Sequence, residues 1–193
     1  MKKLANFLLF QGAWFVTVAG AARGAVWLGP ATFAAVVAVH LLLVSERARE
    51  LRFLLLAGVL GTIADTVLAA LGATAYPSSE AAWHLPIVPP WITALWIGFA
   101  TLPRFSLAWL VRRPGLAALL GAVGGPLSYL AGARLGAVAV SSEPLETWST
   151  LAVEYALATP LLLWLAHGRT FGVLRPPRGV GALPRSGRSS GPG

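Results

Sequence analysis

Residues 53–72 read FLLLAGVLGTIADTVLAALG and decide the fold class, because they form a long apolar run in which Asp65 is the one charged residue. A helix needs about 20 apolar residues to cross roughly 30 Å of hydrocarbon. The run is long enough to do so, and Arg47, Arg49 and Arg52 stand before it. This stretch predicts a transmembrane helix that carries an acidic group inside the membrane.

The rest of the chain has the same character. Its 193 residues are 56% hydrophobic and 11% charged, whereas a soluble domain averages about 25% charged residues. This composition excludes a soluble globule, a disordered chain and a coiled coil. We expect one all-α domain over residues 1–168, a bundle of six transmembrane helices, followed by a basic, disordered tail over 169–193. The expected spans are about 4–22, 25–44, 53–72, 91–111, 115–138 and 148–166.

The basic residues predict how the bundle is oriented. Twelve of the 15 Lys and Arg residues fall on one side of the predicted spans, two fall on the other, and Arg104 lies inside a span. Because cytoplasmic loops carry an excess of Lys and Arg, both termini are predicted to be cytoplasmic. The twelve are Lys2, Lys3, Arg47, Arg49, Arg52, Arg112, Arg113, Arg169, Arg175, Arg178, Arg185 and Arg188, and the other two are Arg23 and Arg134.

The first apolar run has a second interpretation. Two lysines, an apolar stretch and the small residues Ala19-Gly20-Ala21 also resemble a cleavable signal peptide. Asn6 and Gln11 interrupt the apolar stretch, and Trp14 and Phe15 make it bulky. We therefore expect a retained span.

Several chemistries are excluded or unsupported by composition. The chain has no cysteine and three histidines, His40, His84 and His167. We therefore expect no metal, no cofactor and no thiol chemistry, and no sequence motif of a known enzyme class is present. The net charge of +8 belongs to residues between or after apolar runs, so we expect no nucleic acid partner.

Ionisable residues inside predicted spans are the strongest functional signal, because they are rare in membranes and by default mark a site or a buried pair. Asp65 and Glu154 are predicted at similar depth in the outer half of the bilayer, and Arg134 and Arg23 lie near the outer ends of their spans. A polar cavity that opens outward is one interpretation. A buried ion pair, or bonding to a neighbouring backbone, is the other.

Residues 121–137, GAVGGPLSYLAGARLGA, carry a dense pattern of small residues. Gly121 and Gly125, and then Ser128, Gly132 and Gly136, follow small-xxx-small spacing that lets helix backbones approach closely. Gly124-Gly125-Pro126 predicts either a kink in a tightly packed helix or a break that exposes backbone groups to a ligand. Tyr129 and Ser128 supply the hydroxyls beside it.

Arg104 and the loop at 73–90 each have two interpretations. Arg104 follows Pro103, and its side chain either reaches the inner interface or joins a polar layer with Gln11 and His40. The loop at 73–90 contains four prolines and several aromatic residues. It is either an interfacial belt or a lid over an external cavity.

Four stretches together resemble the bacterial membrane proteins grouped as domain-of-unknown-function family 2878. They are FLLFQGAWF at 7–15, VLGTIADTVL at 59–68, PPWITALWIGFATL at 89–102 and GAVGGPLSYLAGARLGAV at 121–138, and the likeness covers about residues 4–167. The resemblance implies a small multi-pass protein of the bacterial inner membrane, with no established activity. Genes of the family neighbour genes for fatty-acid modification, cyclopropane-type lipid methylation included. Pro103-Arg104-Phe105 departs from the family pattern, in which this position is more polar.

The resemblance adds candidate positions to those found from the residues themselves. Gln11, Asp65, Trp96, Gly125, Pro126 and Tyr129 fall within the matching stretches. The candidate ligand-binding residues are therefore Asp65, Glu154, Arg134, Tyr129, Gln11 and Trp96, and the candidate residues for helix packing or a helix break are Gly121, Gly125, Pro126, Gly132 and Gly136.

The leading hypothesis is an accessory or lipid-binding role in membrane lipid metabolism, without catalysis. A small solute or proton-coupled transporter that uses Asp65 and Glu154 is the alternative, and a membrane-embedded lipid-modifying enzyme is a further one. Membrane lipid is the expected partner. A homo-oligomer or partner proteins of lipid metabolism remain open.

Overall fold

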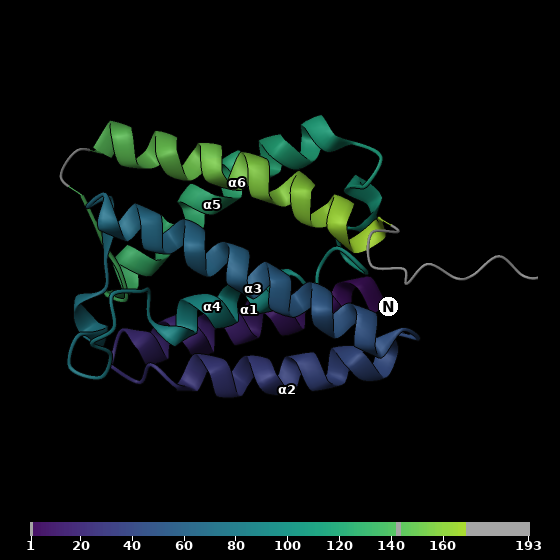
Figure 1. The fold of residues 1–193 in the computed structure, drawn as a ribbon, viewed down its shortest axis with the longest axis horizontal. Coiled ribbons are helices and arrows are strands. Elements are labelled where there is room, and N and C mark those ends of the chain that lie inside the picture. The colour runs from purple at the N-terminus through teal and green to yellow at the C-terminus, as the bar shows by residue number, and fades with distance from the viewer. Residues whose placement is uncertain (1, 142–143, 169–193) are drawn as a thin grey trace, which may run out of the picture.

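The computed structural model describes residues 2–141 and 144–168, and its regular structure is almost entirely helical (Figure 1). The α-helices are α1 (Lys2–Ala21), α2 (Leu28–Leu43), α3 (Arg47–Ala70), α4 (Pro90–Phe99), α5 (Pro114–Leu135) and α6 (Pro144–His167). Two short 3-10 helices are η1 (Pro77–Ser79) and η2 (Ala108–Leu110). The strands β1 (Thr74–Ala75) and β2 (Ala139–Val140) pair antiparallel. The tail predicted over 169–193 lies outside the described residues.

Four of these helices are long and apolar enough to cross a membrane: α1, α3, α5 and residues Leu145–His167 of α6. The shorter apolar helices are α2, with 16 residues, and α4, with 10. At 1.5 Å per residue, α4 covers only about 15 Å of its axis. The chain is thus an all-helical membrane protein, with four helices of spanning length among the described residues.

The prediction of one continuous helix over 91–111 is wrong. α4 ends at Phe99, and the chain continues through turns to η2. Pro103 explains this end, because a proline lacks an N–H group and its ring clashes with the carbonyl four residues earlier, which is that of Phe99. The hydroxyl of Thr101 donates to the carbonyl of Gly98 (2.7 Å) and closes the last turn.

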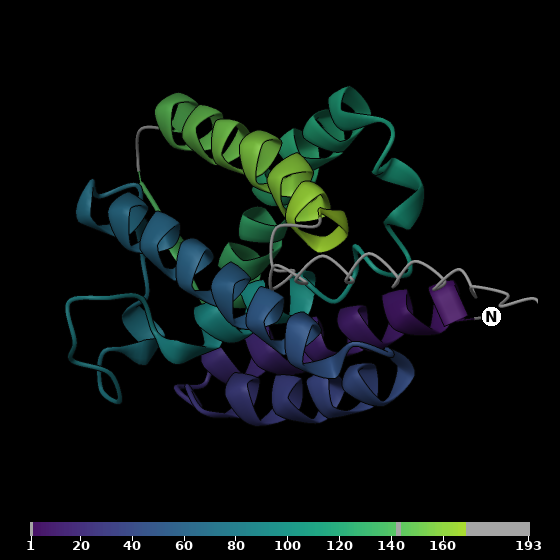
Figure 2. The same ribbon diagram turned by 45° about the vertical axis from the view of Figure 1, so that its right-hand side comes forward.

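The helices form two groups that lie side by side (Figures 1 and 2). α5 and α6 pack together along their lengths and form one group. In the other group, α4 packs between α2 and α3, and α1 packs on α2. Contacts between the groups, such as those of α1 with α5 and of α3 with α6, are sparse. This sparse boundary is where the candidate site lies.

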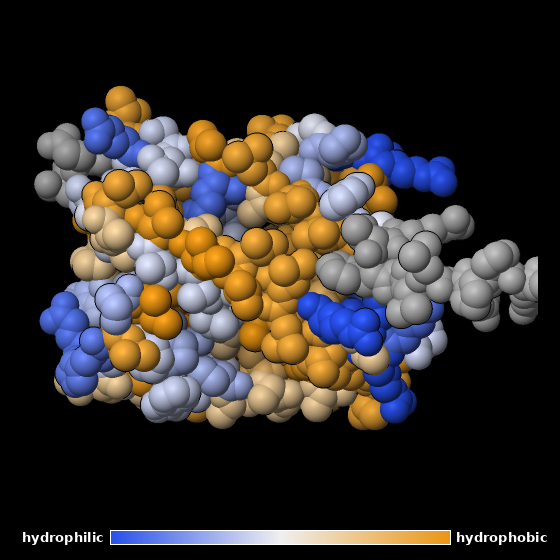
Figure 3. All heavy atoms as spheres, in the orientation of Figure 1, coloured by the Kyte–Doolittle hydropathy of each residue, from blue (hydrophilic) through white to orange (hydrophobic). Residues whose placement is uncertain are grey.

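The two ends of the bundle differ. The terminal end holds the start of α1, the end of α6 and the segments 44–46 and 100–113. The strand end holds β1, β2 and η1. Figure 3 shows hydrophobic residues across the middle of the visible face and most hydrophilic residues near the two ends. This distribution is the one expected of a bundle whose middle lies in hydrocarbon.

Glycines of α5 allow its close packing on α6. A Cβ at Gly121 would lie 2.1 Å from the backbone oxygen of Tyr155, and one at Gly125 would lie 2.3 Å from the Tyr155 ring. A Cβ at Gly132 would meet Val138 at 3.2 Å, and Gly136, with φ of +85°, forms the C-cap of the helix. α5 continues through Pro126 without a break. Of the two interpretations of this stretch, the structure therefore shows tight packing within one continuous helix.

Candidate functional site

Asp65 lies on α3 in the half of the bundle nearest the strand end, and only 1% of it is exposed. The indole Nε1 of Trp96 donates a hydrogen bond to its Oδ2 (2.6 Å), and the hydroxyl of Tyr129 donates to its Oδ1. These donors come from α4 and α5, so one carboxyl joins three helices and both helix groups. Two donors offset part of the cost of burying a carboxyl in the membrane.

Trp96 reaches Asp65 because α3 has a glycine at the point of contact. A Cβ at Gly61 would lie 2.0 Å from the Trp96 ring, so any larger residue would push the indole away. Directly after Gly61, the hydroxyl of Thr62 forms a hydrogen bond with the hydroxyl of Thr93 (2.6 Å), and this bond fixes the register of α3 and α4. Gly61 thus leaves room for the Trp96 indole, and the Thr62–Thr93 hydrogen bond holds the two helices in the register that brings the indole to Asp65.

Tyr155 of α6 completes the aromatic surroundings of the carboxyl. Its ring stacks on Trp96 with centroids 5.1 Å apart and 20° between the planes, and it meets Tyr129 edge-on at 6.4 Å. The same tyrosine packs on Gly121 and Gly125. The small residues of α5 therefore let α6 bring an aromatic ring to the site.

Glu154 is the second acid of this region. Both of its carboxylate oxygens are buried and have no hydrogen-bond partner within residues 2–141 and 144–168. It interacts electrostatically with Asp65. Tyr76, in the loop at the strand end, lies near the same acids. Burial first, and the charge of Asp65 second, raise the pKa of the Tyr76 hydroxyl above its usual range, so this hydroxyl stays protonated.

A cavity of about 470 Å³ lies beside Asp65, between the two helix groups. Its wall is made mainly by aromatic and aliphatic side chains of α1, α4 and α5, with Tyr155 and Thr159 contributed by α6. The exposed large residues of the wall are Phe7 and Phe15 of α1 and Leu120 and Leu127 of α5. The mouth of the cavity therefore lies between α1 and α5, on the apolar side of the bundle.

The cavity is elongated and changes in polarity along its length. On α5 its wall runs from Leu120 to Gly132, which is about 18 Å at 1.5 Å per residue. Asp65, Tyr129 and Ser128 lie toward the strand end. The wall nearer the terminal end is mainly apolar and includes Leu102, Leu107 and Leu110, with Gln11 and Thr159 as its polar side chains. A long molecule with one polar end matches this shape.

The structure brings some of the predicted site residues together and leaves another apart. Trp96 and Tyr129 both donate hydrogen bonds to Asp65, and Gln11 lines the same cavity from α1. Glu154 is close to Asp65 but does not line the cavity. Arg134 is exposed near the end of α5 and is not part of the wall. Neither of the two outer arginines reaches the acids: Arg23 donates to the carbonyl of Ala19 in its own helix (2.9 Å).

Sequence reasoning missed Tyr155 and Thr159. The spacing of four residues between them does place both on one face of α6, and Tyr155 directly follows Glu154. That signal was available but weak, because most faces of an apolar membrane helix look alike.

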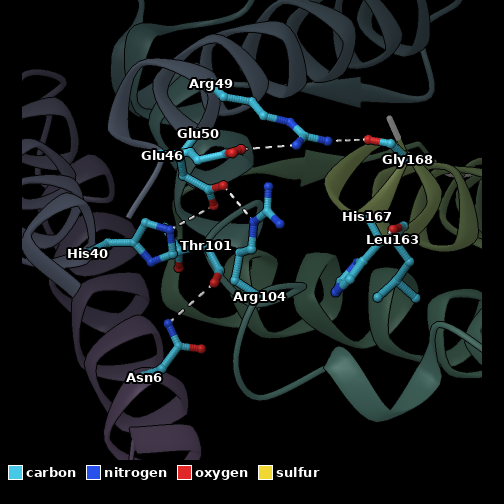
Figure 4. Close-up of polar contacts among 10 residues, drawn as sticks. All are labelled: Asn6, His40, Glu46, Arg49, Glu50, Thr101, Arg104, Leu163, His167 and Gly168. Atoms are coloured by element: carbon cyan, nitrogen blue, oxygen red, sulfur yellow. Dashed lines mark hydrogen bonds and ion pairs between the residues drawn. The ribbon is translucent and has the colours of Figure 1, made fainter. Parts of the chain in front are cut away.

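A second polar cluster lies at the terminal end (Figure 4). Glu50 is 1% exposed; its Oε1 lies 2.9 Å from His40 Nε2, and its Oε2 accepts from Nε of Arg104 (2.6 Å). Asn6 of α1 donates to the carbonyl of Thr101 and accepts from Ser106. These contacts hold the turn after α4 against α1, α2 and α3. Arg104 and His40 thus share a polar layer through Glu50, a residue that sequence reasoning had placed in a loop.

The fold and the site define a helical membrane protein with an apolar cavity beside a buried carboxyl. The sequence model of the family described as "Protein of unknown function (DUF2878)" matches residues 3–161, so the chain belongs to this family. No curated protein and no solved structure matches the chain.

Proposed function

We propose that this protein binds a single-chain lipid within the membrane, as an accessory component of membrane lipid metabolism. The cavity between α1 and α5 is the observation that carries the proposal. It opens where exposed phenylalanines and leucines face the hydrocarbon, so a lipid can enter from the side without crossing water.

The size of the cavity favours one chain over two. If each non-hydrogen atom takes about 30 Å³, the share of one water molecule in the liquid, a volume of 470 Å³ holds on the order of 15 such atoms. One acyl or alkyl chain is of that size, whereas a phospholipid with two chains is several times larger. The length of the cavity, about 18 Å along α5, also matches an extended chain that lies parallel to the helices.

The setting that we propose is the bacterial inner membrane, crossed several times, with the terminal end in the cytoplasm. Lys2, Lys3, Arg47, Arg49, Arg112 and Arg113 all lie in the first turns of helices or in segments of the terminal end. An excess of basic residues on one side is the pattern of cytoplasmic loops.

The direct test is to purify the protein in detergent and to identify by mass spectrometry the lipids that accompany it. We expect one single-chain lipid for each protein molecule, and a rise in Tm when that lipid is added back, because a ligand that binds only the folded state stabilises it. Absence of such a lipid, together with an unchanged Tm on adding single-chain lipids, would contradict the proposal.

A proton-coupled carrier is the second candidate, and the unpartnered carboxyl of Glu154 next to Asp65 favours it. Acidic residues inside the membrane mark proton relays in pumps and transporters. Vesicles that contain the reconstituted protein should then take up solute in response to a pH gradient. Flux that is absent, or that is unaffected by Asp65→Asn and Glu154→Gln, would remove this candidate.

A further inference from the structure

The polar end of the cavity has hydrogen-bond acceptors to spare, whereas the Tyr155 hydroxyl is its one side-chain donor for which no hydrogen bond is found among the described residues. Trp96 and Tyr129 both use their donors on Asp65, and the hydroxyl of Ser128 donates to the carbonyl of Gly125 (2.7 Å). A carboxylate has about four lone-pair sites, and only two at Asp65 are used by these bonds. A ligand whose head lies at this end would therefore bind best if the head donated hydrogen bonds to Asp65.

The charge of the cavity wall also disfavours an anionic head. Among the described residues that line the cavity, none is Lys, Arg or His, and Asp65 is the one acid. An anionic head would lie next to like charge in a medium of low dielectric, where the repulsion is strong. Free fatty acids and phosphate-bearing lipids are therefore poor occupants.

We propose that the cavity takes a single-chain amphiphile whose head donates hydrogen bonds and carries no negative charge, such as a long-chain amine or alcohol. This inference rests on the proposed lipid-binding function and narrows its ligand class. The head lies against Asp65 and Tyr129, and the chain extends toward Leu102, Leu107 and Leu110. Gln11 and Thr159, which also carry donors, lie along the wall nearer the terminal end and beside the chain.

The test uses three photoactivatable probes with the same chain and different heads: analogues of hexadecylamine, hexadecanol and hexadecanoate. Each is mixed with the purified full-length protein, irradiated, and mapped by mass spectrometry of peptides. We expect the amine, the alcohol or both to label α1 and α5 around the mouth at about tenfold lower concentration than the hexadecanoate probe, which is the effect of one hydrogen bond to a charged group. The amine and alcohol arms separate a cationic head from a neutral one.

Asp65→Asn gives a second readout, because it removes the charge and keeps the shape. It should bring the three probes to within about threefold of one another, since the preference comes from that carboxyl. The comparison of the three heads on the unaltered protein stands on its own if this variant does not fold.

The outcomes separate the two proposals. Equal or stronger labelling of the cavity by hexadecanoate would overturn the head-group inference and leave the lipid-binding function standing. Labelling by none of the probes within the cavity would overturn both.

Discussion

Tyr129 and Trp96 satisfy a buried carboxyl that would otherwise be costly in a membrane. Removing one donor should therefore destabilise the fold, because the Asp65 oxygen is left without its partner. We expect Tyr129→Phe to lower the free energy of unfolding by about 1–3 kcal/mol, measured by thermal unfolding in detergent. Tyr155→Phe is the matched control: it keeps the ring that stacks on Trp96, and no hydrogen bond of the Tyr155 hydroxyl is found among the described residues. Equal losses in the two variants would contradict this role for Tyr129.

The Glu50 cluster is the other place where single residues carry large effects. Arg104→Met removes one partner of a carboxyl whose side chain is 2% exposed, and breaking a buried pair from one side costs about 3 kcal/mol or more. We expect a clear fall in the midpoint of unfolding by denaturing detergent. Glu46→Gln, which removes the exposed pair with Arg49 near the same helix start, should cost less than about 1 kcal/mol. An effect of the Arg104 variant no larger than that of the Glu46 variant would show that this cluster is not structural.

At the scale of elements, the contact between α5 and α6 depends on absent side chains. Gly121→Ala would place a methyl group 2.1 Å from a backbone oxygen of α6, so one helix must move. We expect a loss of about 1–3 kcal/mol, the usual range for overpacking. Gly124→Ala is the matched control in the same helix, because its Cβ would meet nothing within 4 Å. It should be neutral or slightly stabilising, since alanine is the better helix former. Similar melting temperatures for the two alanine variants would contradict the observed packing.

The elements also show where sequence reasoning works in a membrane protein. Residues 53–72 predict a helix because apolar length is a strong signal, and α3 covers nearly all of them. The run 91–111 is just as apolar, but Pro103 ends α4 at Phe99, and composition alone does not separate a kinked helix from an ended one. Close packing at Gly121 and Gly125 follows from their spacing. Glu50 was missed because it lies among arginines that were counted as a loop.

The candidate site was predictable in part for a similar reason. Asp65 stands out because a charge inside an apolar run is rare, and Tyr129 follows from its position in the glycine-rich helix. The pairing between them depends on how α3 and α5 face each other, which no pattern along one chain records. Arg134 was expected near the acids because of its depth, but its direction around α5 leaves it exposed.

For the whole molecule, orientation is open to a simple measurement, since the chain has no cysteine. Single cysteines are introduced as Ser45→Cys, between α2 and α3, and as Ala81→Cys, in the loop after η1; both positions are exposed. A maleimide that does not cross membranes should label the Ala81 variant in intact spheroplasts, and the Ser45 variant only after permeabilisation, because we propose that the basic end faces the cytoplasm. The opposite labelling would reverse the proposed orientation.

The central claim is that a single-chain lipid occupies the space between α1 and α5, and the most direct measurement is lipid occupancy by native mass spectrometry in a variant that blocks the mouth. Gly124 lines the cavity and has open space at its Cβ, so Gly124→Leu should fill the entrance without disturbing the fold. Gly12→Leu puts the same side chain on the exposed face of α1, away from the cavity wall, where it also has open space. We predict that bound lipid falls about tenfold or more in the Gly124 variant and is unchanged in the Gly12 variant. Equal occupancy in both, with both variants folded, would contradict the account.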